Sequence, residues 1–200
     1  VVLRGCGEVV WAEGPDDPDP QILPCKPGDV HHYPAYTYHT IQNPAHHEEP
    51  LEYLMFRWSS APDWARPAPL LQRNQYPAVF APEATFDPPQ GFHSRLLFEG
   101  PTRHLNKLHA HMRWVFPGAG YDAHADAYDV AILLMHGAVE SLGQTVHAPA
   151  LLFHPTGTLH GLKAIGDGPA HYLVLEFHGT VEARRRGALA VWLQRILSRN

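Results

Sequence analysis

Histidine is the residue type most able to do chemistry in this sequence, since 16 of its 200 residues are histidine. The imidazole ring ligates metals and moves protons near neutral pH. In His124-Ala-Asp126 an imidazole and a carboxylate stand two residues apart, so a strand would project both from one face. In Pro155-Thr-Gly157-Thr-Leu-His160 a histidine follows a tight-turn signal, and the turn would aim its side chain. Both patterns favour metal ligation.

Other reactive arrangements are missing from the sequence. It contains no glycine-rich phosphate loop, no nucleophile elbow and no paired redox cysteines. Two cysteines are too few for a disulfide framework or a four-cysteine zinc site, and with no signal peptide visible we expect a reducing, cytoplasmic setting. The net charge of −5 argues against a nucleic-acid partner. Apolar runs such as 130–135 are too short to cross a bilayer.

The elements that must position these side chains are short strands. Proline and glycine together make up 36 of the 200 residues (20 and 16), which favours many turns over long helices. Short segments separated by turn residues recur along the chain, as in a sandwich or a barrel. Residues 61–90 are rich in proline and lack helical periodicity, so we interpret them as a linker. Residues 181–200 predict an amphipathic helix, packed on the barrel or on a partner, because apolar side chains recur at helical spacing: Leu189, Trp192, Leu193, Ile196 and Leu197.

Two parts of the sequence match each other in order. Residues 28–39 align with residues 149–160 at an offset of 121. Downstream, residues 50–58 align with 169–177 at an offset of 119, and upstream Gly5 aligns with Gly137 at an offset of 132. The offset drifts because the loops differ in length. Three matches in the same order predict a duplicated β unit.

The second copy resembles the cupin family in both of that family's motifs. The first motif is a glycine, five residues, His-x-His, a glutamate and a closing glycine, and Gly118, His124 and Gly137 stand at matching positions. The second motif contains Pro-x-Gly-x-x-His, which residues 155–160 match. In the first copy Tyr36 replaces the second glycine of that motif, while four residues match it: Gly28, Pro34, His39 and Asn43.

The resemblance implies a bicupin, an all-β protein with two double-stranded β-helix (jelly-roll) barrels, here with a short C-terminal helix. The expected domains are a first barrel over 1–60, the linker over 61–90, a second barrel over 91–180 and the helix over 181–200. Shifting His124 back by the upstream offset of 132 puts its counterpart before Val1. We therefore expect residues to be missing before Val1, which leaves His39 as an orphan ligand candidate.

The resemblance also implies a metal site in the second barrel, held by His124, Asp126 and His160. Asp126 replaces the second histidine of the family motif, and the glutamate position falls on an apolar residue. Asp129 is a fourth candidate if a bulge near 127–128 turns it inward. Two imidazoles and a carboxylate suffice for a facial triad, which suits Fe, Mn, Ni or Zn and leaves positions open for substrate. The alternative is a barrel that has lost its metal and keeps a polar pocket.

Two functions are compatible with the resemblance. The first is a cupin enzyme, an isomerase, epimerase, decarboxylase or dioxygenase, that acts on a small polar metabolite such as a sugar derivative; the fold does not choose among these reactions. The second is a non-catalytic cupin that binds a small ligand or has a structural role, which the replaced histidine and glutamate favour. Family members pair through barrel edges, so we expect a homodimer with no nucleic-acid or membrane partner.

Several polar residues outside the motifs are further candidates. His109, His111 and Arg113 either line the second barrel's cavity or face solvent, and His154 is a candidate neighbour of His160. Tyr128, Tyr172 and Glu176 are candidates for polar groups in the cavity. The alternation of strand side chains would decide between inside and outside, and the sequence leaves it open.

Overall fold

The computed structural model describes residues 1–58, 62, 72–74 and 91–180, and every regular element in these ranges is a β-strand. The all-β prediction is confirmed. The expected helix over 181–200 and most of the expected linker over 61–90 lie outside the described residues. No helix in the described part is long and apolar enough to cross a membrane. The chain divides into two units: one has Val1–Arg57 and Gln72–Asn74, and the other has 91–180 with Trp58 and Pro62.

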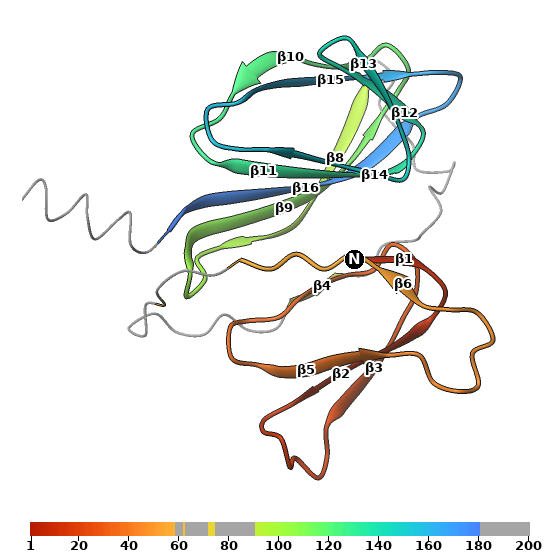
Figure 1. Ribbon diagram of the computed structural model, residues 1–200, viewed down its shortest axis with the longest axis vertical. Coiled ribbons are helices and arrows are strands. Elements are labelled where there is room, and N and C mark those ends of the chain that lie inside the picture. The colour runs from red at the N-terminus through yellow and green to blue at the C-terminus, as the bar shows by residue number, and fades with distance from the viewer. Residues whose placement is uncertain (59–61, 63–71, 75–90, 181–200) are drawn as a thin grey trace, which may run out of the picture. The chain divides into compact units, whose positions relative to one another are not determined.

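The described residues of the first unit form three small antiparallel sheets (Figure 1). Its strands are β1 (Val2–Arg4), β2 (Gly7–Ala12), β3 (Gln21–Cys25), β4 (Val30–His32), β5 (Tyr38–Gln42), β6 (Glu52–Tyr53) and β7 (Gln72–Asn74). Strand β2 lies between β3 and β5, β1 pairs with β6, and β4 pairs with β7. The core is small and consists of Val2, Val9 and Cys25, with Tyr33, Ile41 and Leu51 packed against it.

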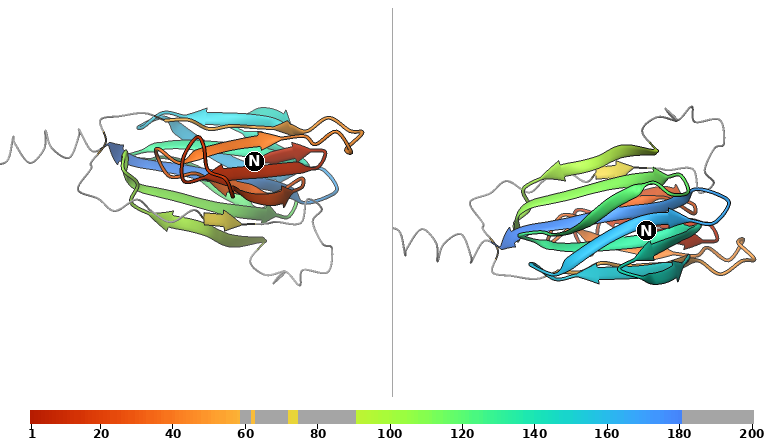
Figure 2. Two further views of the ribbon diagram at one scale, coloured as in Figure 1. Left: turned by 90° about the horizontal axis from the view of Figure 1, so that it is seen from below. Right: turned by 90° about the horizontal axis from the view of Figure 1, so that it is seen from above.

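The second unit packs a five-stranded sheet against a four-stranded sheet (Figure 1). The five-stranded sheet has the order β14 (Ala150–His154), β11 (Asp129–His136), β16 (Ala170–Thr180), β9 (Leu105–Val115) and β8 (Phe92–Gly100). The four-stranded sheet has the order β10 (Gly120–Ala125), β15 (Leu159–Ile165), β12 (Ala138–Ser141) and β13 (Gln144–His147). The strand β8 closes one edge of the larger sheet, as Figure 2 shows. Two facing antiparallel sheets of this kind form a jelly roll.

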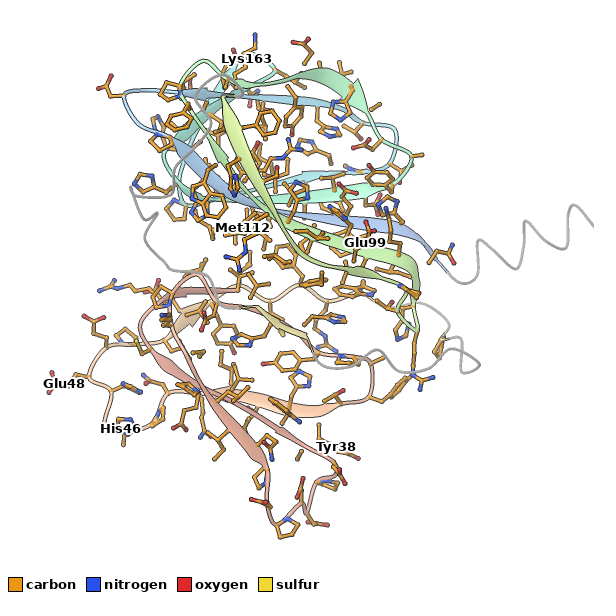
Figure 3. The ribbon with its side chains drawn as sticks, turned by 180° about the vertical axis from the view of Figure 1, so that it is seen from behind. Tyr38, His46, Glu48, Glu99, Met112 and Lys163 are labelled. Atoms are coloured by element: carbon orange, nitrogen blue, oxygen red, sulfur yellow. The ribbon has the colours of Figure 1, made fainter. Side chains whose placement is uncertain are left out.

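The alternation of side chains along the strands decides which residues face the interior of the second unit. Alternate residues of β11, such as Val130 and Ile132, join the core, and so do Tyr172 and Val174 of β16 and Val115 of β9. They meet Val139, Leu162 and Ala164 from the four-stranded sheet. Any residue that continues this alternation therefore points toward the same interior. Figure 3 labels Glu99 on the larger sheet and Lys163 on the smaller one.

The two copies of the sequence repeat share the same turn. In each copy the N–H three residues after the motif proline donates to the proline carbonyl, at 2.9 Å for Pro155 and 3.3 Å for Pro34. The residue two after the proline is left-handed, with φ of 77° at Gly157 and 68° at Tyr36. Glycine adopts this conformation freely, whereas a side chain makes it cost about 1–2 kcal/mol. The first copy thus keeps the turn at the price of strain at Tyr36.

Candidate metal centre

A bulge in β10 brings the two motif histidines together. Tyr121 pairs with Leu162, but His124 pairs with His160, so β10 holds one extra residue between these pairs. The bulge fits because position 161 is glycine: a Cβ there would lie 2.9 Å from the backbone nitrogen of Ala123. The imidazoles of His124 and His160 consequently face each other with ring centres 4.5 Å apart.

Asp126 completes the group from the loop that follows β10. Its Oδ2 lies 3.6 Å from Nε2 of His124 and 3.3 Å from Nε2 of His160. One ligand atom from each of the three residues falls within 4.8 Å of the others. The structure thus brings together three of the four residues that the family resemblance implies as metal ligands.

The backbone orients both imidazoles in the same way. Nδ1 of His124 donates to the carbonyl of Asp122 at 3.0 Å, and Nδ1 of His160 donates to the carbonyl of Thr158 at 3.1 Å. These hydrogen bonds place the proton of a neutral ring on Nδ1 and leave the Nε2 lone pair facing Asp126. Three electron-pair donors therefore converge with no hydrogen between them. A cation at the centre, or a proton on one of the rings, would balance the carboxylate in this arrangement.

The group is closed on one side and open on the other. The side chain of His160 is 4% exposed, that of Asp126 is 20% exposed, and that of His124 is 48% exposed. A metal held by three ligands from one side keeps positions for a further ligand. The exposure gradient sets the open side next to His124.

Aromatic side chains surround the buried part of the site. The ring of His154 stacks on His160 with centres 4.5 Å apart and planes 15° apart, and the edge of Tyr121 meets both motif histidines. Burial, followed by the nearby His160, lowers the pKa of His154, so His154 is neutral at pH 7. Burial raises the pKa of Tyr121, whose hydroxyl stays protonated. His154 is thus a neighbour of His160, as the sequence suggested.

Asp129 lies apart from these three residues. Its Oδ1 accepts hydrogen bonds from the backbone N–H and the hydroxyl of Thr156, each at 2.8 Å. It is the first residue of β11, where it pairs with Phe177. Its carboxylate therefore ties β11 to the turn that precedes His160, and the bulge that would have turned it inward lies in β10 instead.

The histidines left open by the sequence face the interior. His109, His111 and Arg113 continue the alternation that takes Val115 into the core, and His111 is 8% exposed. Burial, with help from Arg113 and His109, lowers the pKa of His111 to about 3. Glu176 pairs with His109 across β16 and β9. Together His109, His111 and Glu176 form a second group able to hold a metal.

In the first unit His39 has the same local geometry as His160, but the described residues give it no counterparts of His124 and Asp126. Its Nδ1 donates to the carbonyl of Thr37 at 2.8 Å, and Tyr33 stacks on its ring at 3.9 Å. Among the described residues, no group of three metal-ligand side chains includes His39.

Comparison with known proteins gives structural neighbours alone. No family model matches the sequence, and no curated protein matches it. Solved structures with similarity include a protein with a cupin-like fold from Ralstonia eutropha (21% identity over 44% of this chain and 55% of that chain, TM-score 0.38) and an RmlC-like cupin from Shewanella frigidimarina (22% identity, 45% and 78%, TM-score 0.37). A chain of the complex of SigE with the anti-sigma ChrR from Rhodobacter sphaeroides is similar at 17% identity over 43% of this chain, with a TM-score of 0.37. This chain spans 45% of that chain's length.

The 91–180 unit is a jelly roll, and we call it the cupin-like unit because its two motifs resemble those of cupins. The assignment rests on the unit's own two facing sheets and on the strand pair that sets His124 opposite His160. The similarity to these solved structures concerns the fold and does not indicate an activity for this cupin-like unit. The expectation that residues 1–60 form a first cupin barrel, incomplete at its N-terminus, stays a prediction.

The sequence indicates that His109 and His111 share a strand face, but it does not indicate that Glu176 lies beside them. His109-x-His111 has strand spacing, yet Glu176 is far away along the chain, and the pairing of β9 with β16 cannot be read from sequence.

Proposed function

We propose that the cupin-like unit binds a divalent metal ion through His124, Asp126 and His160 and uses it to hold a small polar ligand. The observation that carries the proposal is the convergence of two Nε2 lone pairs on the Asp126 carboxylate. The donor set of two imidazoles and one carboxylate fits Fe, Mn, Ni or Zn. When bound, such an ion supplies positive charge that polarises a ligand oxygen or activates a bound water.

Buried polar atoms beside the site support a polar ligand. Nε2 of His154 and Nε of Arg113 are buried and have no hydrogen-bond partner among the described residues. Buried polar groups are nearly always paired in folded proteins, so these atoms mark places where a ligand or water binds. The guanidinium of Arg113 lies 5.9 Å from the ring centre of Tyr121, which in turn contacts both motif histidines. A cation at this point favours a ligand with an acidic group.

The side chains divide the work around that ligand. His160 is held by its backbone hydrogen bond and by the stacked ring of His154, so its Nε2 has a fixed direction. Asp126 offsets part of the charge of a bound ion. Arg113 would orient the acidic group of the ligand, and the neutral His154 would donate or accept one hydrogen bond. Enzymatic isomerase, epimerase, decarboxylase or dioxygenase chemistry on such a ligand, for which a sugar derivative is one candidate, is the finer proposal.

Metal analysis tests the proposal first. The protein is stripped with a chelator, loaded separately with Fe(II), Mn(II), Ni(II) and Zn(II), and the retained metal is measured by mass spectrometry. We expect the wild type to retain metal, His160→Ala to lose the metal bound at this site, and the exposed His147→Ala to match the wild type. The proposal would be wrong if the wild type retained none of these metals, or if His160→Ala retained as much metal as the wild type. The function would then be ligand binding in a non-catalytic, metal-free pocket.

Ligand binding is tested separately. Thermal unfolding is measured with a panel of small carboxylated metabolites, sugar acids included, with and without metal. A ligand that stabilises the metal-loaded wild type should stabilise Arg113→Gln less. Equal stabilisation of both proteins would remove Arg113 from the ligand site.

We also propose that the protein is a cytoplasmic homodimer, as the family resemblance implies. Light scattering coupled to size exclusion should give twice the mass of one chain, and a single-chain mass would contradict the dimer.

A further inference from the structure

A second group of ligand-type side chains lies across three strands of the larger sheet. His109 on β9 pairs with Glu99 on β8 on one side and with Glu176 on β16 on the other. His111 stands two residues along β9, on the same interior face. Ligand atoms of His109, His111 and Glu176 all lie within 4.8 Å of one another. This group lies outside both family motifs.

Two of the three members, His109 and Glu176, are oriented by a neighbour outside the group. Nδ1 of His109 donates to Oε2 of Glu99 at 2.6 Å, so Nε2 of His109 accepts the hydrogen bond from Nδ1 of His111 at 2.9 Å. A bound metal would take the place of that proton. Nε2 of His178 donates to Oε2 of Glu176 at 2.8 Å. A carboxylate behind a ligand histidine and a donor behind a ligand carboxylate are the outer contacts that metal sites use to fix their ligands. The second group has both kinds of contact, from Glu99 to His109 and from His178 to Glu176.

The group is reachable from solvent. The side chain of His109 is 21% exposed and that of Glu176 is 18% exposed, whereas that of Glu99, which Figure 3 labels, is 44% exposed. An ion would therefore enter beside Glu99. Lys107 also contacts Glu99, at 3.4 Å, which leaves this carboxylate a weaker direct ligand than Glu176.

We propose that His109, His111 and Glu176 bind a second divalent transition-metal ion inside the same jelly roll. Two imidazole nitrogens and one carboxylate favour transition metals such as Ni and Zn over Ca and Mg, which prefer all-oxygen ligands. A metal between Nε2 of His109 and Nδ1 of His111 accounts for two nitrogens that approach each other and one carboxylate that faces them. A proton shared by the two rings is the competing occupant.

Tyr128 lies between the two proposed sites. Burial, followed by the carboxylates of Glu176 and Asp126, raises the pKa of its hydroxyl to about 12. Its ring also packs against His178 with centres 3.8 Å apart. The hydroxyl is thus placed to donate to a carboxylate of either site, which connects them through one side chain.

Metal stoichiometry separates the two sites. Ni²⁺ is titrated into chelator-treated protein at pH 7.5 by calorimetry, with the fold of each variant checked by circular dichroism. We expect two ions per chain for the wild type and for His147→Ala, and one ion for each of three variants: His160→Ala, Glu176→Gln and His109→Gln. Glu176→Gln keeps the shape of the side chain and protects the test against misfolding. The combination of His160→Ala with Glu176→Gln should bind none.

The outcomes distinguish the two proposals. If the wild type binds one ion and His160→Ala abolishes it, the second site is wrong and the first stands. If Glu176→Gln and His109→Gln each lose one ion while His160→Ala loses none, the second site stands and the proposed function is wrong. Nitrogen NMR of the histidine side chains gives an independent reading: Zn²⁺ should shift the ring nitrogens of His109 and His111, and unchanged resonances would leave a shared proton there.

Discussion

Replacement of Gly161 by alanine should separate the two motif histidines. The added Cβ would lie 2.9 Å from the nitrogen and 3.0 Å from the Cα of Ala123, and 3.2 Å from the carbonyl carbon of Asp122. All three atoms belong to the backbone of the β10 bulge, so no flexible side chain can move aside. An ordinary contact begins at 3.4 Å, and the shortfall from 2.9 Å is about 0.5 Å. The strand β10 must therefore shift away from β15, and it carries His124 with it.

The effect on metal binding follows from the narrow range of metal–ligand distances that a bound ion tolerates. Metal–ligand distances hold to within about 0.2 Å, so a shift of about 0.5 Å is more than a bound ion tolerates without loss. Loss of the contacts that orient metal ligands weakens metal affinity by about 10–100-fold. We expect the same range for Gly161→Ala, which corresponds to about 1.4–2.7 kcal/mol of binding free energy. Overpacking of the strand pair should also reduce the free energy of unfolding by about 1–3 kcal/mol.

The assay is calorimetric titration of Ni²⁺ into the wild type, Gly161→Ala and Gly168→Ala. A Cβ at Gly168 meets nothing within 4 Å, and its backbone does not have the left-handed φ that makes alanine strained. Gly168→Ala should therefore bind the metal as the wild type does. Equal affinity in all three proteins would refute the argument that the bulge positions His124.

Three further predictions concern single residues. His171 is 2% exposed, and burial, followed by the nearby His136, lowers its pKa from 6.5 to about 4. As pH falls, this imidazole is therefore protonated in the unfolded chain before it is protonated in the folded one. The contribution of neutral His171 to the free energy of unfolding is complete above pH 6.5, and up to about 3 kcal/mol of it is lost as pH falls toward 4. Urea unfolding at pH 7 and pH 4.5 should show a smaller loss of stability in His171→Phe than in the wild type. Tyr36→Gly should raise the free energy of unfolding by about 0.5–1 kcal/mol because it relieves the left-handed φ, whereas Tyr38→Gly in a strand should lower it; a loss in both would contradict the strain. Asp129→Ala should cost about 1–3 kcal/mol through its two lost hydrogen bonds while metal stoichiometry stays unchanged, and a lost ion would return Asp129 to the ligand set.

The motif spacings predicted the part of the site that local geometry determines. The turn at Pro155 and the strand after it fix the direction of His160 within six residues, so the sequence pattern was enough. The position of the Asp129 carboxylate depends on a turn 27 residues away, where the backbone N–H of Thr156 donates to it. The second histidine group depends on the register of β16 against β9, which pairs Glu176 with His109. Contacts of this kind are set by the whole sheet, and spacing along the chain does not reveal them.

The two copies of the repeat show which feature would turn an oriented histidine into the metal ligand that we propose. His39 and His160 share the turn, the hydrogen bond from Nδ1 to a carbonyl two residues earlier, and a stacked ring at the same position, Tyr33 in one copy and His154 in the other. The turn therefore orients an imidazole in both units. The second unit adds a partner strand whose bulge sets His124 opposite and delivers Asp126, and among the described residues His39 has no such partners. One imidazole binds a divalent ion weakly and three converging donors bind it well, so the strand pair of β10 and β15 would carry the affinity of the proposed site. This is why a substitution at Gly161, which changes no proposed ligand side chain, is the sharper test of the site than another change in the turn.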